Sequence, residues 1–493
     1  MKDHQQTDNY DHVLKYTSVF GGVQVLVILI GLVRNKFMAL LLGAGGMGFN
    51  SLLMSVQNFV SQCTNLGISF SAVPALSKYY DQGRWELLDY YISVIRLWSL
   101  IAAVLGLVVC VTVSPLIDNL SFNWGNHTLH YAMLGLAVAM AAITGGETAV
   151  LKATRHLGPL ARIQLYTAIG TVVISVPLYY YFSVSGVVPA IVLTAVLIML
   201  TTVAYSYRHY PLRLQFSHSQ LKHGAGMIRL GLAFVSAAAF GSASEVFIRS
   251  FLNVEGGLDD VGLYNVGFMI TITYAGMVFS SMETDYFPRL SAVSKDIEKT
   301  NETVNKQTEV SLLLLSPMLV GLLMLLPILV PMLLSNEFIS VIPMAQLAVL
   351  AMYFKVITMP VAYITLARSH SLSYLFLECS YFVTLVAAIV VCYRQWGIWG
   401  TGLAIVIAHI VENVLVIVYA YWQYGYRCRT SVVRYASVQL LIGVFAYGTS
   451  CRADGWLYWT AEAALLLAST AYSVHILRQK THLWEALKGK FRI

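Results

Sequence analysis

A chain of 493 residues that is 58% hydrophobic and only 11% charged cannot cover its surface with polar groups. About a quarter of the residues of an average soluble domain are charged, so the composition excludes a soluble globular protein and predicts a membrane protein. The net charge of +7 does not require nucleic acid as a partner, because the cytoplasmic loops of membrane proteins are rich in Lys and Arg.

Apolar segments of about 20 residues recur along the whole chain, and a helix of that length crosses the hydrocarbon core of a bilayer. The polar N-terminal segment is not followed by a cleavage site, so we expect the first apolar segment to be a retained helix. The sequence therefore predicts an all-α polytopic membrane protein of about fourteen helices, at residues 13–41, 49–75, 89–115, 128–150, 162–182, 184–207, 226–252, 262–284, 310–334, 340–366, 371–393, 397–422, 433–450 and 457–477.

Basic residues orient these helices. With the N-terminus in the cytoplasm, the cytoplasmic connections carry most of the Lys and Arg residues, whereas the opposite connections "DNLSFNWGNH", "FSVSG" and "LSNEFISVIP" carry none. Arg394 and Arg452 are the main exceptions. This positive-inside bias predicts that both termini are cytoplasmic and that the basic connections lie near anionic lipid heads.

Two stretches of the chain, residues 31–79 and 246–293, resemble each other at a constant offset, apart from one slip inside a Gly-rich turn. The matched positions are Arg34 with Arg249, Gly48 with Gly262, Pro74 with Pro288, Ser77 with Ser291 and, more weakly, Arg155 with Arg368 and Gly186 with Gly397. Each copy has an even number of helices and starts on the same side, so the sequence predicts two parallel six-helix repeats around a central cavity.

The repeat also predicts the domain organisation. Residues 1–224 are expected to form an N-terminal six-helix lobe and residues 225–424 a C-terminal six-helix lobe. Residues 425–493 would then add helices 13 and 14 and a cytoplasmic tail. Transporters built in this way rock two lobes about a cavity between them.

Four cations within the apolar segments, Arg34, Lys36, Arg249 and Lys355, are the candidate substrate-binding residues. A charge at mid-bilayer costs about 2.5–3.5 kcal/mol, so such residues normally face a wet cavity. If the repeats are related by an axis along the membrane normal, Arg34 and Arg249 face each other across the lobe interface. The alternative is a local pair of Glu245 with Arg249, four residues apart, but this leaves Arg34 and Lys36 unexplained. The pattern favours an anion-binding cavity.

Acidic residues in the same segments are possible charge partners of these cations or ion-coupling groups. Glu147, Glu245 and Glu378 are candidates for either role.

His409, Glu412 and Asn413 fall on one face of a single predicted helix. A proton or sodium site is one interpretation, and a satisfied polar cluster between helices is the favoured one. Arg96 and Glu462 lie near predicted helix ends, where we expect their side chains to snorkel toward water.

No catalytic or cofactor motif is present in the sequence. The six cysteines form no CxxC pair, and most fall inside apolar segments, which excludes a zinc ribbon and a disulfide framework. We find no Ser/His/Asp set, no metal-spaced His/Cys cluster and no nucleotide loop. The sequence therefore predicts a transporter rather than an enzyme, with no cofactor and no metal.

Several stretches resemble a known family. "METDYFPRLSAVSKDIEKTNETVNKQTEV" (282–310), "LLSNEF" (333–338), "YFKVITMPVAYITLARSHSLSYLFLECSYF" (353–382) and "LGAGGMGFN" are similar to bacterial O-antigen flippases of the multidrug/oligosaccharidyl-lipid/polysaccharide exporter superfamily. The resemblance covers about the first 420 residues. It implies twelve core helices in two lobes, a cationic cavity and movement of undecaprenyl-pyrophosphate-linked oligosaccharide across a bacterial inner membrane. Membrane lipids and a glycan polymerase machinery are the implied partners. The extra helices 13 and 14 depart from the shorter members.

Three other functions stay open on the sequence. A lipid II flippase also has a cationic cavity, so the sequence discriminates poorly against it. A cation-coupled drug exporter would favour acids rather than arginines in its cavity. A membrane glycan polymerase or ligase usually has a large periplasmic loop, which this chain lacks.

Overall fold

The computed structural model describes residues 2–122, 125–212, 218–452 and 455–480. In these residues all regular secondary structure is helical. Two compact units are present: unit 1 comprises Met1–Gly262 with Leu333–Ser335, and unit 2 comprises Leu263–Met332 with Asn336–Ile493. The predicted lobe boundary at residue 224 follows the sequence repeat rather than the packing, and it stays a prediction.

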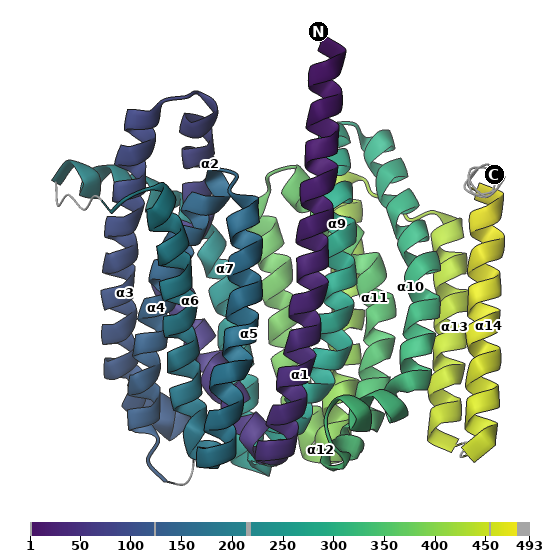
Figure 1. Cartoon of the computed structure of the whole chain (residues 1–493). Coiled ribbons are helices and arrows are strands. Elements are labelled where there is room, and N and C mark those ends of the chain that lie inside the picture. Colours follow the sequence, from purple (N-terminus) through teal and green to yellow (C-terminus); the bar gives the residue numbers. More distant parts are fainter. Residues whose placement is uncertain (1, 123–124, 213–217, 453–454, 481–493) are drawn as a thin grey trace. The chain divides into compact units, whose positions relative to one another are not determined.

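Unit 1 consists of long helices joined by short turns. Its elements are α1 (Lys2–Thr64), α2 (Ile68–Asp81), α3 (Trp85–Ser121), α4 (Thr128–Ala153), α5 (Leu157–Phe182), η1 (Ser183–Gly186), α6 (Val187–His209) and α7 (His218–Gly256), followed by the start of α8 (Leu258–Phe268). Helices α3, α4 and α6 run side by side (Figure 1). Apolar side chains from α2, α3 and α4, among them Leu76, Leu88 and Ile95, form one buried core.

Unit 2 also consists of long helices joined by short turns. Its elements are the end of α8, the π-helical turn η2 (Met269–Thr273), α9 (Tyr274–Val293), α10 (Ile297–Leu333), η3 (Asn336–Val341), α11 (Ile342–Ala367), α12 (Ser371–Tyr424), α13 (Thr430–Arg452) and α14 (Gly455–Lys480). Helices α13 and α14 lie against each other along their length (Figure 1). A core of Leu313, Tyr435 and Ile476 packs both of them against α10.

Nine helical stretches in the described residues are long and apolar enough to cross a membrane. Three of them have 43, 52 and 54 residues. These are interrupted at Gly43, at η1 and at Gly397, so each provides two crossings. Together with α7 and the α8–α9 pair, they account for the predicted fourteen helices.

Glycines permit two of these interruptions. Gly43 and Gly397 have φ angles of 66° and 58°, in the left-handed region that glycine adopts without a Cβ penalty. Two predicted spans are less regular than expected. Leu66 and Gly67, also at positive φ, divide the predicted helix 49–75 into the end of α1 and α2. The turn η2 interrupts the predicted helix 262–284.

The internal repeat has a direct counterpart in the packing of unit 1. A Cβ placed on Gly48 would lie 1.9 Å from the carbonyl oxygen of Leu258, and a Cβ on Gly262 would lie 2.0 Å from that of Ala44. Ala44 and Leu258 are separated along the chain by the same offset as Gly48 and Gly262. The contact is therefore reciprocal, as it is for two-fold-related surfaces.

The offset between Gly48 and Gly262 holds at the later turns as well. Arg155 and Ser369 both adopt positive φ, 57° and 60°, between a helix end and a following helix that starts after His156 or His370. Arg155 therefore corresponds to Ser369 rather than to Arg368, and the sequence alignment was wrong by one residue here.

The second correction concerns the turn between the last two helices of each repeat. Ser183 and Gly397 share an unusual backbone conformation, with φ and ψ of 51° and −133° and of 58° and −144°. The correspondence of Gly186 with Gly397 is thus wrong by three residues. Gly186 corresponds to Gly400, because each lies closely over the carbonyl of an equivalent residue, Leu178 or Cys392.

The slip placed inside the Gly-rich turn is also unnecessary. Gly43 and Gly257 both have positive φ, and the helices before them are uninterrupted over the matched residues. Counting back along these helices aligns Arg249 with Asn35 instead of Arg34. Positions one residue apart on a helix point in directions about 100° apart, so the repeat does not make Arg34 and Arg249 symmetric partners.

Candidate functional site

Unit 2 contains a cavity of about 260 Å³ that is lined by charged residues. Helix α11 contributes Lys355 and Thr358, and α12 contributes Tyr374, Glu378 and Glu412. The other lining residues are Gly276, Phe279, Met359, Ala362 and Tyr363. Three residues that the sequence analysis selected separately, Lys355, Glu378 and Glu412, are thus brought together from two helices.

Unit 1 contains a cavity of similar size, about 290 Å³. Its wall is made by one face of α4 together with residues of α1 and α6. The lining residues are Gln57, Ala141, Thr144, Gly145, Thr148, Ala149, Lys152, Ala195 and Ile198. Lys152 is the charged residue among them, and the sequence analysis used it only to orient the helices.

The two cavities occupy equivalent places in the two repeats. At the offset between Gly48 and Gly262, Thr144 corresponds to Thr358, and four further lining positions correspond in the same way: Ala141 with Lys355, Gly145 with Met359, Thr148 with Ala362, and Ala149 with Tyr363. Ile198 corresponds to Glu412, and Gln164 occupies the position of Glu378. The same helical framework thus holds Ala, Gln and Ile in unit 1 where unit 2 holds Lys, Glu and Glu.

The comparison of the two cavities indicates which of their residues the fold requires. Because unit 1 builds the equivalent helices with neutral residues, the fold does not need the three charges of unit 2. Charged groups within a membrane are costly and are retained where they act on ions or substrates. The unit 2 cavity is therefore the stronger candidate site.

This cavity is not purely cationic, as the sequence analysis expected of the substrate site. Lys355 shares it with two carboxyl groups, Glu378 and Glu412, so full ionisation of all three would leave one excess negative charge. An uncompensated charge in a low-dielectric site is strongly disfavoured. A proton or a small cation bound by a carboxyl group would restore the balance, so the cavity is suited to exchanging positive charge, and Lys355 could bind an anion once that charge is in place.

The neighbouring polar residues of α12 are satisfied by packing. Asn413 donates to Thr358 Oγ1 at 2.9 Å and to the carbonyl of Phe354 at 3.3 Å. His409 is buried, its Nδ1 lies 3.0 Å from the carbonyl oxygen of Ile405, and its ring packs on Tyr381. Asn413 thus joins α12 to α11, whereas the contacts of His409 lie within α12 and Glu412 lines the cavity.

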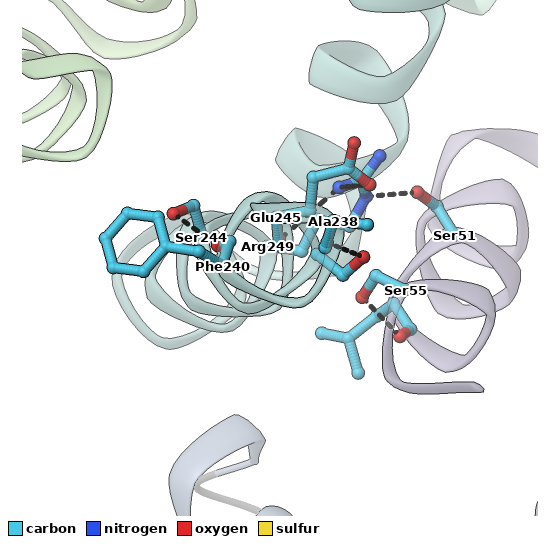
Figure 2. A network of polar contacts seen from close by, with 9 residues as sticks. Ser51, Ser55, Ala238, Phe240, Ser244, Glu245 and Arg249 are labelled. Atoms are coloured by element: carbon cyan, nitrogen blue, oxygen red, sulfur yellow. Dashed lines mark hydrogen bonds and ion pairs between the residues drawn. The ribbon is translucent and has the colours of Figure 1, made fainter. Parts of the chain in front are cut away.

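Arg249 lies in unit 1 and connects α7 to α1. Its Nε donates to Ser51 Oγ at 2.8 Å, and one terminal nitrogen contacts the carboxylate of Glu245 at 3.2 Å. Figure 2 shows this side chain reaching from α7 toward Ser51. The local pair with Glu245 that the sequence left as the alternative is thus formed, but the guanidinium is nearly buried while Glu245 is partly exposed.

The two other predicted cations of unit 1 lie on α1. Lys36 Nζ donates to the backbone carbonyl of Leu334. Arg34 is half-buried, and its Nε is buried without a hydrogen-bond partner in the part of the chain that the structure describes. Lys355 belongs to unit 2, so the four predicted cations are divided between the units, and a shared cavity for them stays a prediction.

Glu147 has a specific partner that the sequence did not identify. Its carboxylate accepts hydrogen bonds from Arg96 Nε at 2.8 Å and from Ser206 Oγ at 2.6 Å. Arg96 also donates to the backbone carbonyls of Tyr210 and Pro211. The expectation that Arg96 snorkels is wrong, because the side chain is only 4% exposed. A paired carboxylate of this kind fixes the end of α6.

Glu462 is likewise buried instead of snorkelling. Its carboxylate accepts a hydrogen bond from Thr449 and thereby joins α14 to α13. Helix α14 is also joined to α10, because Lys480 pairs with the buried Glu309 at 2.5 Å. Sequence position alone does not distinguish a residue at the membrane interface from one buried between helices, because it carries no information on how the helices pack.

Comparison with known proteins gives a family and a fold. Residues 37–343 match the model of a family described as polysaccharide biosynthesis protein. The sequence matches no curated protein. Among solved structures, the lipid II flippase MurJ in an inward closed conformation is similar, with a TM-score of 0.73, 14% identity, and coverage of 94% of this chain and 99% of that chain.

Two transporters of the MOP superfamily are also similar. A multidrug resistance MATE family transporter in an inward-facing conformation has a TM-score of 0.63 and 16% identity, covering 81% of this chain and 94% of its own. A MOP superfamily transporter from Pyrococcus furiosus has a TM-score of 0.55 and 15% identity, covering 83% and 93%. At these identities the likeness shows the fold, an all-α membrane transporter fold.

Proposed function

The chain belongs to the family of polysaccharide biosynthesis proteins, and from this membership and its transporter fold we propose that it flips a lipid-linked oligosaccharide. The substrate is an undecaprenyl-pyrophosphate-linked O-antigen or related surface polysaccharide unit. It moves from the cytoplasmic to the periplasmic leaflet of a bacterial inner membrane by alternating access. The protein breaks no bond, keeps both termini in the cytoplasm and delivers its product to a glycan polymerase machinery.

One observation carries this proposal: charges are placed in the unit 2 cavity at positions where the equivalent cavity has none. In unit 2, Lys355, Glu378 and Glu412 stand at the positions that Ala141, Gln164 and Ile198 occupy in unit 1. A pyrophosphate head is an anion that a lysine ammonium can bind as a point charge. Tyr374 lines the same cavity, and a phenolic O–H is a suitable partner for a sugar.

The carboxyl groups give this cavity a means of release. Glu378 and Glu412 compete with the pyrophosphate for the ammonium of Lys355, because all three anions favour the same cation. Neutralising a carboxylate with a proton or a small cation removes that competition. Binding of the head and of the cation is therefore coupled, and each raises the affinity of the other by the same factor.

The predicted cations of unit 1 have a separate role in the proposal. Arg34, Lys36 and Arg249 supply positive charge along α1 and α7, where a guanidinium offers paired donors to phosphate oxygens. Arg34 is the member with a buried, unpartnered donor among the described residues. An incoming phosphate oxygen would satisfy it.

The membrane potential supplies the energy. It is worth about 2.3 kcal/mol per elementary charge per 100 mV. A pyrophosphate with about two uncompensated negative charges gains about 4–5 kcal/mol at that voltage on moving outward. Each cation that accompanies the head removes about 2.3 kcal/mol of this gain. The steepness of the voltage dependence therefore reports how many cations the two carboxyl groups carry.

Complementation tests the substrate. In a bacterial strain that lacks its own O-antigen flippase, expression of this protein should restore surface polysaccharide, and the Lys355→Ala variant should restore it much less at equal membrane abundance. A strain depleted of its lipid II flippase serves as the second arm. Rescue of the second strain and not of the first would overturn the proposed substrate.

Reconstitution tests the mechanism. In vesicles containing the lipid-linked oligosaccharide, an imposed potential alone should drive net flipping without a pH or sodium gradient. Flipping that stays absent under the potential and starts only with an ion gradient would establish obligate coupling. Glu378 and Glu412 would then be the first candidates for the ion site.

A lipid II flippase is the second candidate function, because the similarity to MurJ extends over 94% of this chain, compared with 81–83% for the MATE and MOP transporters. The difference in coverage of this chain is close to the fraction of its residues that lie in α13 and α14. A drug exporter is disfavoured by Lys355 in the cavity. A polymerase or ligase is the least favoured reading.

A further inference from the structure

A second polar cavity of unit 2 lies apart from the candidate site, at the end of unit 2 where α10 begins and α12 ends. It is open, has a volume of about 680 Å³, and is lined by Ile297, Glu298, Asn301, Tyr421, Trp422, Gly425 and Arg427. None of these residues lines the cavity of Lys355. The position at the helix ends corresponds to the headgroup region of a bilayer that the helices cross.

Aromatic residues mark this interface. Trp422 is 83% exposed and Tyr421 is 54% exposed, which would be unfavourable for such large side chains in water. Trp and Tyr are enriched where lipid headgroups meet acyl chains, because their rings are apolar and their N–H or O–H groups are polar. The two side chains therefore suit contact with the glycerol and upper acyl region of a lipid.

The backbone that carries Arg427 is held rigidly beside the cavity. Its N–H donates to Asn301 Oδ1 at 2.8 Å, and its carbonyl accepts from Asn305 Nδ2 at 3.0 Å. Asn301 also donates to the carbonyl of Gly425 at 3.1 Å. These bonds fix the α12–α13 connection on α10, so the backbone that carries the Arg427 guanidinium has a defined position.

Arg427 and Glu298 are opposite charges that line one cavity without pairing. Other acids at this end bind a basic residue of their own segment: Asp285 pairs with Arg289, Asp296 with Lys299, and Glu302 with Lys306. Within the described residues, the side chains of Arg427 and Glu298 form no ion pair and no hydrogen bond. An unpaired cation and an unpaired anion across one cavity are complementary to a zwitterion.

We propose that this cavity binds the headgroup of phosphatidylethanolamine, with the phosphate on Arg427 and the primary ammonium on Glu298. A guanidinium forms charge-assisted hydrogen bonds to phosphate oxygens, and an ammonium has three donors for a carboxylate. Trp422 and Tyr421 pack against the glycerol and the acyl chains. The site takes a structural lipid of the leaflet and is independent of the transported substrate.

Lipid association measures this directly. The full-length protein is reconstituted in phosphatidylcholine vesicles with trace phosphatidylethanolamine, phosphatidylcholine or phosphatidylglycerol, each spin-labelled on an acyl chain so that the head is intact. The immobilised fraction gives relative association constants. Wild-type protein should prefer phosphatidylethanolamine over both other lipids. Arg427→Gln should weaken that association about tenfold, the effect of losing one charge-assisted hydrogen bond.

Glu298→Gln distinguishes a zwitterion site from a simple anion site. This variant should lose the preference for phosphatidylethanolamine over phosphatidylglycerol, because the carboxylate both attracts the ammonium and repels a net anion. Glu302→Gln and Arg429→Gln are matched controls on the same segments outside the cavity lining, and they should leave the preference unchanged. A wild-type preference for phosphatidylglycerol, or a phosphatidylethanolamine preference that survives both cavity variants, would overturn the proposal.

Discussion

Gly48 and Gly262 pack backbone against backbone, and each occupies the same position in its own repeat. The Cβ of an alanine at Gly48 would lie 1.9 Å from the carbonyl oxygen of Leu258, and one at Gly262 would lie 2.0 Å from that of Ala44. Real Cβ atoms do not approach a carbonyl so closely, so the two segments can meet only where both residues lack a side chain. This steric requirement explains why both copies of the repeat have a glycine at this position.

Substitution of either glycine should destabilise the protein. Gly48→Ala and Gly262→Ala should each lower the free energy of unfolding by about 1–3 kcal/mol, the cost of overpacking a close contact, which a thermal unfolding midpoint in detergent would detect. Gly31→Ala is the control, because a Cβ there meets nothing within 4 Å; it should be neutral or slightly stabilising, since alanine favours a helix. Equal destabilisation by all three substitutions would contradict the packing argument.

The pair of Arg96 and Glu147 should be structural. Removing one partner leaves a buried charge unpaired, so Arg96→Met or Glu147→Leu alone should cost about 3–5 kcal/mol of stability. The double variant should be less destabilised than either single variant and should still transport, as measured by unfolding midpoints and by surface polysaccharide. A double variant that is folded and abundant in the membrane yet inactive would assign Glu147 a transport role instead.

Conversion of the unit 2 cavity to the residues of unit 1 tests the candidate site. The triple variant Lys355→Ala, Glu378→Gln, Glu412→Ile carries side chains that the equivalent helices already accommodate in unit 1. It should fold with unchanged or raised stability and should lose most flipping activity in vesicles. Thr148→Ala, which places the residue of Ala362 in unit 1, is the matched control and should retain activity. Normal flipping by the triple variant would exclude this cavity as the transport site.

Arg249 should require its guanidinium as well as its charge. Arg249 bonds Ser51 and Glu245 through different nitrogens, a geometry that the single ammonium of a lysine does not reproduce. Arg249→Lys should therefore restore transport only partly relative to Arg249→Ala, with equal amounts of folded protein in the membrane. Full activity of the lysine variant would show that charge alone suffices.

Topology can be measured by labelling single cysteines in a cysteine-free background. Gly125→Cys, between α3 and α4, should react with a membrane-impermeant reagent added from outside. Lys299→Cys, near the start of α10, should react only after the membrane is opened. Reaction of both sites from the same side would contradict the fourteen-helix arrangement and the proposed cytoplasmic termini.

The sequence by itself determined the membrane class, the approximate helices and the repeat, because each of these depends on local hydropathy or on spacing along the chain. It also selected Lys355, Glu378 and Glu412 individually, since a charge within an apolar segment is visible without any neighbours. It did not align the repeats correctly before the Gly-rich turn or at the two later turns between helices. Backbone angles at Arg155 and Ser369, and at Ser183 and Gly397, were needed for that.

The tertiary structure alone decided which charges meet. Lys355 and Glu412 come from different helices, α11 and α12, yet they line one cavity, and Arg96 and Glu147 pair across α3 and α4. Such contacts depend on how helices rotate and pack, and hydropathy does not specify rotation when lipid and protein interior are both apolar. The structure establishes that Ala141 and Lys355 occupy equivalent positions in the two repeats. The helices of the second repeat therefore carry charges that their packing does not require.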